Sequence, residues 1–267
     1  MAFTATFGGA EETKAKPKYK TFKVDLWATD LNPTEIGIMK QTQHEAESVQ
    51  FTKDMEIFGQ IKDGRERTGI LAYRKEMWKT GEGMKRRLVL KLFSEGMHWR
   101  GTAELLMGRS LQLSIGAKGT PVPSYSVNIS RHDQIIQLER SAQKWPLFPE
   151  KFSFFIDTTK GPRFYRLRRN VIGIGADYSL YDDRGRKIGK LDHRIINLGG
   201  SWIVKVDAAE SYAKLEAVLQ MFCALLKFNG AARRHVAKEV EQLHLGRAVR
   251  QLDTQERNLY LNPRRRR

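Results

Sequence analysis

The residues with the clearest chemical potential are cations grouped in the second half of the chain. Four arginines lie on or beside one expected strand, and four more cations lie on the hairpin that follows it. They are Arg163, Arg166, Arg168, Arg169, Arg184, Arg186, Lys187 and Lys190. Guanidinium forks match the geometry of phosphate oxygens, so neighbouring strands would make these cations a site for phosphorylated anions. The alternative is that they only keep edge strands soluble.

The overall charge supports an anionic partner. The formal net charge is +17, from 47 Lys and Arg residues against 30 Asp and Glu residues. Such an excess favours lipid headgroups, nucleic acid or an acidic protein, without choosing among them. A second cationic group ends the sequence, as Arg264, Arg265, Arg266 and Arg267. This run would bind anionic lipid or nucleic acid through charge alone.

Other kinds of chemical site leave no signal in the sequence. The 6 histidines lack the spacing of a zinc site. Glycines near residues 116 and 173 are not in the order of a phosphate-binding loop, and there is no Gly-x-Ser-x-Gly motif. The sequence therefore predicts no catalytic residue, no metal ligand and no cofactor.

An apolar helix is expected over Tyr212–Phe228, and the rest of the chain is expected to pack around it. Between Ala217 and Leu226 only Gln220 is polar, so the helix has no wide polar face. A helix that is apolar all round is buried in protein or in a membrane. A membrane span needs ~20 mostly apolar residues, and charged residues end this run earlier. We therefore predict burial inside the protein, with no transmembrane span.

The segments before this helix have the pattern of short β-strands. Apolar and polar residues alternate between turn signals, as in SWIVKV, where Trp202, Val204 and Val206 share one face. Leu111–Ile115 (LQLSI) is interpreted as one more strand. The predicted fold is mostly β with some α, a closed or strongly curled β-barrel around the apolar helix. Asn229-Gly230 is expected to cap that helix, and a basic helical extension follows from Ala231.

The span Phe164–Phe228 resembles the LURP-one-related family, which is grouped with tubby C-terminal domains and phospholipid scramblases. The resemblance is carried by the strand around Arg166, the hairpin Asp177–Leu191 (DYSLYDDRGRKIGKL), the strand SWIVKV and the apolar helix, in that order. It implies a twelve-stranded closed barrel around a central C-terminal helix, and binding of phosphoinositides or other anionic lipids. No short lipid-binding signature matches, so no residue is carried over as an established ligand.

These observations divide the chain into three expected parts. They are a flexible leader over residues 1–20, the tubby-like barrel with its helix over 21–228, and a basic helical tail over 229–267. The second half of the barrel, 151–228, has the clearest pattern. The N-terminus has no secretory signal and the one cysteine, Cys223, forms no internal disulfide, so an intracellular protein is expected.

The predicted function is a non-enzymatic binding module for phosphorylated anionic ligands. Phosphoinositide or other anionic lipid headgroups at a membrane surface come first among these ligands. The alternative is a nucleic-acid or ribonucleoprotein-associated scaffold that uses the Arg-rich tail. A scaffold that meets an acidic protein partner is a third reading, and membrane insertion of the helix is a fourth, disfavoured by its length.

Overall fold

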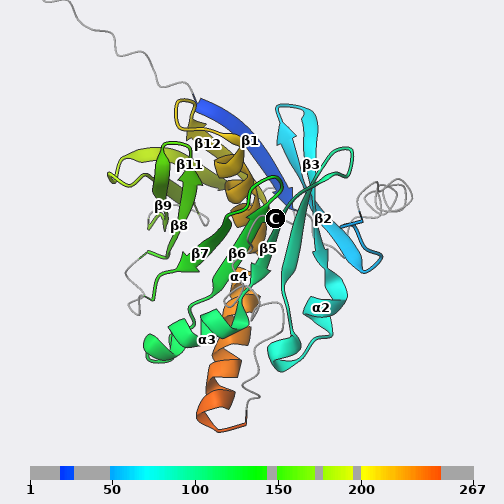
Figure 1. The fold of residues 1–267 in the computed structure, drawn as a ribbon, viewed down its shortest axis with the longest axis vertical. Coiled ribbons are helices and arrows are strands. Elements are labelled where there is room, and N and C mark those ends of the chain that lie inside the picture. The colour runs from blue at the N-terminus through cyan, green and yellow to red at the C-terminus, as the bar shows by residue number, and fades with distance from the viewer. Residues whose placement is uncertain (1–18, 27–48, 143–148, 172–176, 195–199, 248–267) are drawn as a thin grey trace, which may run out of the picture.

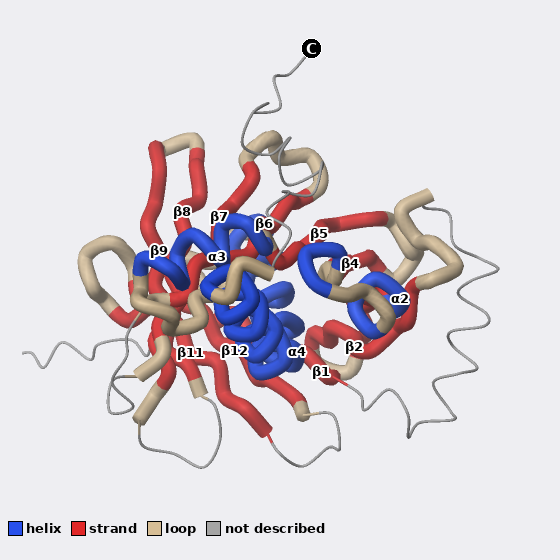
Figure 2. Tube along the Cα trace, turned by 90° about the horizontal axis from the view of Figure 1, so that it is seen from below, coloured by secondary structure: helices blue, strands red, loops and turns tan. Residues whose placement is uncertain are grey.

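The protein forms one closed antiparallel β-barrel of twelve strands, with a long helix inside it (Figures 1 and 2). The computed structural model describes residues 19–26, 49–142, 149–171, 177–194 and 200–247. Most of the expected leader and the end of the expected tail lie outside these ranges. The predicted fold class, a mostly β barrel around a C-terminal helix, is confirmed.

The barrel is an up-and-down arrangement in which neighbours in sequence are neighbours in space. The strands are β1 (Tyr19–Leu26), β2 (Met55–Asp63), β3 (Glu66–Arg74), β4 (Val89–Ser94), β5 (Trp99–Leu105), β6 (Ser124–Ile129), β7 (Ile135–Arg140), β8 (Lys151–Thr158), β9 (Gly161–Arg169), β10 (Tyr178–Tyr181), β11 (Lys187–Arg194) and β12 (Ser201–Asp207). Each strand pairs with the next, and β1 closes the barrel against β12. Strands β7 and β8 pair only at Glu139–Ser153 and Arg140–Phe152, so closure removes most of the exposed strand edge but leaves the rest of this seam unpaired.

Alternation along the strands decides which residues fill the barrel. On β9, Tyr165 and Leu167 point inward and are buried, whereas Arg166 and Arg168 point outward and are exposed. On β12 the three predicted inward residues, Trp202, Val204 and Val206, are all buried. Successive side chains on a strand face opposite sides, so each apolar-polar strand supplies one face to the core and one to the surface.

The barrel interior is filled by α4 (Ala213–His244), which enters directly after β12 (Figure 2). Every residue from Ala217 to Leu225 is buried, including Cys223. Phe222 lies edge-on to Phe152, with 5.1 Å between ring centroids. An 18-residue window of α4 has a mean hydropathy of 1.2, so the helix is long and apolar enough to span a membrane. However, 67% of this window is buried inside the protein.

The predicted cap at Asn229-Gly230 is wrong, because α4 continues through both residues to His244. Beyond the barrel the helix is flanked by α3 (Met107–Gly116) and α2 (Lys75–Lys79) (Figure 1). Burial of the later turns offsets the cost of an interior glycine, which is about 1 kcal/mol relative to alanine. Just beyond the helix end, the Gly246 amide donates to the Leu243 carbonyl and the Arg247 amide donates to the Gln242 carbonyl.

The predicted strand Leu111–Ile115 is also wrong, because these residues belong to helix α3. Its buried positions are Met107, Ser110, Leu111 and Ser114, which is helical rather than alternating spacing. The Ser110 hydroxyl donates to the Leu106 carbonyl at 2.6 Å and accepts from the Ser124 amide at 2.9 Å. These hydrogen bonds therefore attach α3 to the start of β6. The alternating, strand-like pattern of LQLSI gives no sign of this role. Strand β5, the helix α2 and the short 3₁₀ turn η1 (Gly83–Lys85) had no counterpart in the sequence prediction.

Candidate anion-binding surface

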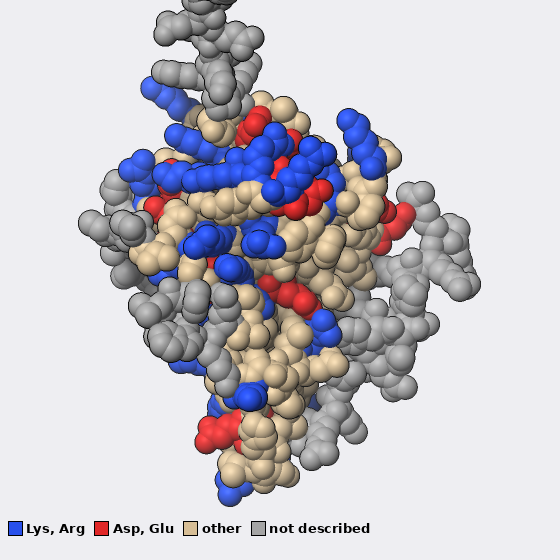
Figure 3. All heavy atoms as spheres, turned by 90° about the vertical axis from the view of Figure 1, so that its left-hand side faces the viewer, with Lys and Arg blue, Asp and Glu red and all other residues tan. Residues whose placement is uncertain are grey.

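The eight predicted cations lie on two strands and one turn of the same side of the barrel. Four are on β9, and the others are on β11 or on the turn between β10 and β11. Strand β10 separates β9 from β11, and it pairs with both. Figure 3 shows Lys and Arg side chains gathered across this face of the molecule.

Register extends this group to strands that the sequence prediction did not include. Arg168 on β9 is opposite Lys151 on β8, and Lys190 on β11 is opposite Lys205 on β12. Arg168 and Lys190 are both opposite Ser179 on β10, so the four cations belong to one row across five strands. We call this group the basic band; its members are Lys151, Arg166, Arg168, Lys187, Lys190 and Lys205.

The pairing of like charges in the basic band has an energetic cost. Lys151 faces Arg168 and Lys190 faces Lys205, and like charges directly opposite on antiparallel strands are destabilising. Lys190 has a carboxylate partner, Asp192, at 2.6 Å. Among the described residues, no ion pair joins Lys151, Arg168 or Lys205 to a carboxylate. The band therefore keeps excess positive charge on its surface.

A contrasting pair shows how this barrel compensates like charges elsewhere. Lys23 on β1 is opposite Lys62 on β2. The Asp25 carboxylate lies between them, 2.7 Å from the Lys23 Nζ and 3.7 Å from the Lys62 Nζ. At the Lys190–Lys205 pair, Asp192 contacts Lys190 alone, and no carboxylate in the described part of the chain pairs with Lys205.

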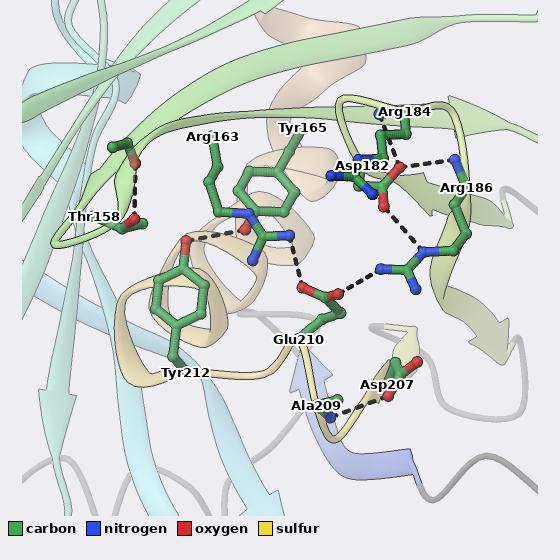
Figure 4. A network of polar contacts seen from close by, with 11 residues as sticks. Thr158, Arg163, Tyr165, Asp182, Arg184, Arg186, Asp207, Ala209, Glu210 and Tyr212 are labelled. Atoms are coloured by element: carbon green, nitrogen blue, oxygen red, sulfur yellow. Dashed lines mark hydrogen bonds and ion pairs between the residues drawn. The ribbon is translucent and has the colours of Figure 1, made fainter.

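Two of the predicted cations are held by the protein itself (Figure 4). The Arg163 Nη2 donates to Glu210 at 2.6 Å, and the Arg186 guanidinium donates to the other oxygen of the same carboxylate. Arg186 also donates to Asp182, from Nε at 3.1 Å. Arg163 and Arg186 are thus already neutralised within the chain. We call this arrangement the Glu210 clamp; it joins β9 and the β10–β11 turn to the β12–α4 connection.

The electrostatics of the Glu210 clamp keep its carboxylates ionised. Burial raises the pKa of Glu210, but the hydrogen bond and charge of Arg163, followed by Arg186, outweigh burial and hold the pKa below its ordinary value. Burial also raises the pKa of Asp182. Hydrogen bonds from the Arg186 amide, the Arg186 side chain and the Arg184 amide outweigh burial and hold this pKa below its ordinary value. Both carboxylates therefore stay ionised at neutral pH and keep their ion pairs with Arg163 and Arg186.

A pair of aromatic side chains, one exposed and one half-buried, adjoins the basic band. Phe155 on β8 faces Phe164 on β9, with 4.8 Å between ring centroids, and Phe155 is 56% exposed. The Arg166 guanidinium lies 5.5 Å from the centre of the Phe164 ring. This surface thus places apolar rings beside cations, a combination that suits amphipathic partners.

Of the other predicted contacts, Arg169 is exposed at the end of β9 and Arg184 is exposed in the turn between β10 and β11. Arg264–Arg267 lie outside the described residues. Sequence reasoning missed Lys151 and Lys205; their outward positions in KFSFFI and SWIVKV were the available signal, but the strand order that makes them neighbours was not. Within the described ranges, no group of three His, Cys, Asp or Glu side chains is placed to hold a metal ion.

Comparison with known proteins gives no relative. No family model matches the chain, and no curated protein or solved structure shows significant similarity to it. The resemblance to the LURP-one-related family therefore stays a prediction, and the function must be argued from the surface itself.

Proposed function

We propose that this protein is a non-enzymatic binding module that recognises phosphorylated anionic ligands at a membrane surface, through the basic band. The observation that carries the proposal is the pairing of like charges across neighbouring strands. No described carboxylate pairs with Lys151 or Arg168, and Asp192 pairs with Lys190 but not with Lys205. A surface selected only for solubility would intersperse charges of both signs. A row of cations instead matches the phosphates of anionic lipids, each cation adding about 1 kcal/mol near such a surface.

The aromatic pair beside the band favours lipid among the anionic partners. Phe155 is exposed although it is apolar, and its ring would enter the interfacial region while Arg166 stays at the headgroups. An intracellular location agrees with this reading, because the cytoplasmic leaflet carries the negative surface potential. The same combination of rings and cations can stack nucleic-acid bases, so RNA is an arm of the test.

Vesicle flotation at low salt tests the proposal. The protein is mixed with phosphatidylcholine vesicles, with vesicles containing phosphatidylserine, and with vesicles containing a phosphoinositide at matched total charge. The band variant carries Ala at four positions without an ion pair in the described structure: Arg166, Arg168, Lys187 and Lys205. The control removes four exposed cations from the remainder of the molecule: Lys53, Arg65, Lys79 and Lys238.

We expect the band variant to bind anionic vesicles roughly a thousandfold more weakly, because four contacts of about 1 kcal/mol are lost. The control variant should lose far less, since its cations lie outside the band. Binding should also weaken as salt is added. Absence of binding to every anionic vesicle, or equal loss in both variants, would sink the proposal.

The alternative function, nucleic-acid binding by the Arg-rich tail, is separated by truncation after Leu252. Under the proposal the truncated chain keeps most of its vesicle binding, because the basic band is intact. If truncation abolishes binding to vesicles and to a single-stranded RNA alike, the tail rather than the barrel is the binding element.

A further inference from the structure

A polar cavity lies outside the barrel wall, at a distance from the basic band. Its volume is about 300 Å³, at the lower end of the range for small-molecule sites. The floor is formed by outward side chains of β4, β5 and β6, strands that lie across the barrel from β10, β11 and β12. Its polar lining includes Arg74, Arg87, Lys91, Thr102, Glu104, Ser126 and Asn128, and the Trp99 side chain lies beside them. We call this space the Lys91 cavity.

The charges around the Lys91 cavity do not cancel. Arg87 pairs with Glu104, and Arg74 pairs with Asp54 at 2.7 Å. Lys91 is only 9% exposed, yet in the described structure its Nζ has no carboxylate partner and donates to the backbone and side-chain oxygens of Gln50, at 2.9 and 2.7 Å. Three cations and two carboxylates leave one positive charge in a largely buried place.

Burial of an uncompensated charge is costly, and Lys91 responds to it. Burial, followed by the positive charge of Arg74, lowers the pKa of Lys91 below its ordinary value. Ammonium groups have three donors, and Gln50 takes two of them. One donor and one unit of charge therefore remain for a bound group.

Neutral polar groups surround this ammonium. The Trp99 indole donates to the Thr102 Oγ1 at 3.0 Å, which leaves the Thr102 hydroxyl proton to be donated elsewhere. The Ser126 hydroxyl and the Asn128 amide line the same space, and no side-chain hydrogen bond joins them to other described residues. Met77, Val89 and Ile135 supply apolar wall. A few convergent polar groups on an apolar wall are typical of a small-molecule site.

We propose that the Lys91 cavity binds a small organic molecule that carries one carboxylate, with the carboxylate on Lys91 and the body of the molecule against Trp99 and Ile135. One uncompensated positive charge matches a monoanion better than a phosphate dianion, because Arg74 and Arg87 are already paired. Hydroxyl or amide groups on the molecule would be met by Thr102, Ser126 and Asn128. This proposal is independent of the basic band.

Ligand-observed NMR on the full chain tests the site with a matched set of probes. The carboxylates are hexanoate, benzoate, phenylacetate and 4-hydroxybenzoate; the comparison compounds are the corresponding amides and phenyl phosphate. The cavity variant is Lys91→Met, which keeps an unbranched side chain of similar length. The control is Lys53→Met, at an exposed lysine that does not line the cavity. Thermal melting of each variant verifies that it is folded.

We expect at least one carboxylate to bind with millimolar affinity or better, and its amide to bind at least tenfold more weakly. Lys91→Met should weaken carboxylate binding at least tenfold, while Lys53→Met should leave it unchanged. A bound carboxylate should also slow reductive methylation of Lys91. The proposal is overturned if no carboxylate binds, if amides bind equally well, if phenyl phosphate is preferred, or if folded Lys91→Met binds as the parent chain does. If Lys91→Met fails to fold, the amide comparison and the methylation of Lys91 decide.

Discussion

Lys190 on β11 and Lys205 on β12 occupy directly opposed positions on the outside of the barrel. Opposed residues on antiparallel strands have Cβ atoms about 5 Å apart, so two ammonium groups there repel one another. Asp192 partly compensates Lys190, at 2.6 Å, whereas no carboxylate is paired with Lys205 among the described residues. Stability and binding therefore make opposite demands on position 205.

The first prediction concerns this conflict. Lys205→Glu replaces a repulsive pair by an attractive one, so the free energy of unfolding should rise by about 0.2–1 kcal/mol. The same change removes one cation from the basic band and adds an anion, so affinity for anionic vesicles should fall at least tenfold. Urea unfolding and vesicle flotation measure the two effects.

Lys53→Glu is the matched control, because it makes the same charge change at an exposed position outside the band. It should weaken vesicle binding much less. Were Lys205→Glu to bind vesicles as tightly as the parent chain, the basic band could not be the binding surface.

The second prediction concerns the Glu210 clamp. Glu210→Gln removes the charge that holds Arg163 and Arg186, and Glu210 has a side chain only 14% exposed. Loss of charge-assisted hydrogen bonds should lower the free energy of unfolding by about 1–3 kcal/mol at neutral pH. Arg163 would lose its carboxylate partner, whereas Arg186 would keep its ion pair with Asp182, at 3.1 Å. Vesicle binding should therefore tighten only slightly.

The pH dependence of this variant follows from the lowered pKa of Glu210. A carboxylate whose pKa is lower in the folded chain contributes stability above its ordinary pKa, 4.5, and loses that contribution as pH falls through the folded value. The difference between parent and Glu210→Gln should therefore be full at neutral pH and shrink well below 4.5. The exposed Glu241→Gln should change stability little at either pH. A difference that is constant from neutral to acid pH would contradict the clamp.

The sequence predicted the parts of the fold that depend on local pattern. Alternation placed Trp202, Val204 and Val206 on one face, and the all-apolar turns around Cys223 predicted the buried helix. The sequence pattern also predicted that eight cations lie on neighbouring elements of the barrel. The sequence could not show which residues far apart in the chain become neighbours. Glu210 is 47 residues from Arg163, and Lys205 becomes a neighbour of Lys190 only through the register of β11 and β12.

The two wrong predictions, a helix end at Asn229-Gly230 and a strand at Leu111–Ile115, have a shared physical cause. Local propensity favours an end at Asn229-Gly230 and a strand at Leu111–Ile115, yet α3 and the end of α4 pack against each other outside the barrel. Tertiary burial outweighs differences of about 1 kcal/mol in propensity. Short patterns therefore mislead where an element is stabilised by a distant neighbour.

The third prediction follows from two glycines, Gly230 inside α4 and Gly246 just beyond its end. Gly230 is exposed in the helix interior, and a Cβ there would meet only the Arg234 Nη1, at 3.7 Å. Gly230→Ala should raise the free energy of unfolding by about 1 kcal/mol, because alanine loses less entropy in a helix. Thermal melting or urea unfolding measures this gain.

Gly246→Ala is the matched comparison with the opposite sign. Gly246 has φ +69° at the helix end, a conformation that favours glycine. Alanine there should cost about 1 kcal/mol. A gain from Gly246→Ala together with a loss from Gly230→Ala would mean that the helix ends at residue 230 in solution, as the local pattern suggests.

The fourth prediction concerns His235, on the part of α4 that leaves the barrel. The imidazole is 5% exposed and lies edge-on to Trp78, with 6.1 Å between ring centroids. Burial, followed by the charge of Arg86, lowers the pKa of His235 to about 4. The unfolded chain, with a pKa near 6.5, therefore binds this proton more tightly than the folded chain.

The sign of the effect follows from linkage. Stability is full above the unfolded pKa and falls as pH drops from 6.5 towards about 4, because protons favour the unfolded chain in that window. His235→Phe keeps an aromatic ring beside Trp78 and removes the titration, so its stability should fall less over the same window. Urea unfolding at several pH values measures this. The exposed His244→Gln should behave as the parent chain, since its side chain meets water in both states.

Glu239 and burial have opposite effects on the pKa of His235, so either outcome of the pH test identifies the larger effect. Its Oε1 lies 3.9 Å from the His235 Nδ1, close enough to attract a protonated ring. If that attraction exceeded the cost of burial, the pKa of His235 would rise and acidification through the same window would stabilise the parent chain relative to His235→Phe. A lower relative stability of the parent at pH 5 than at pH 7 instead means that burial dominates, and that the junction of α4 with Trp78 excludes water.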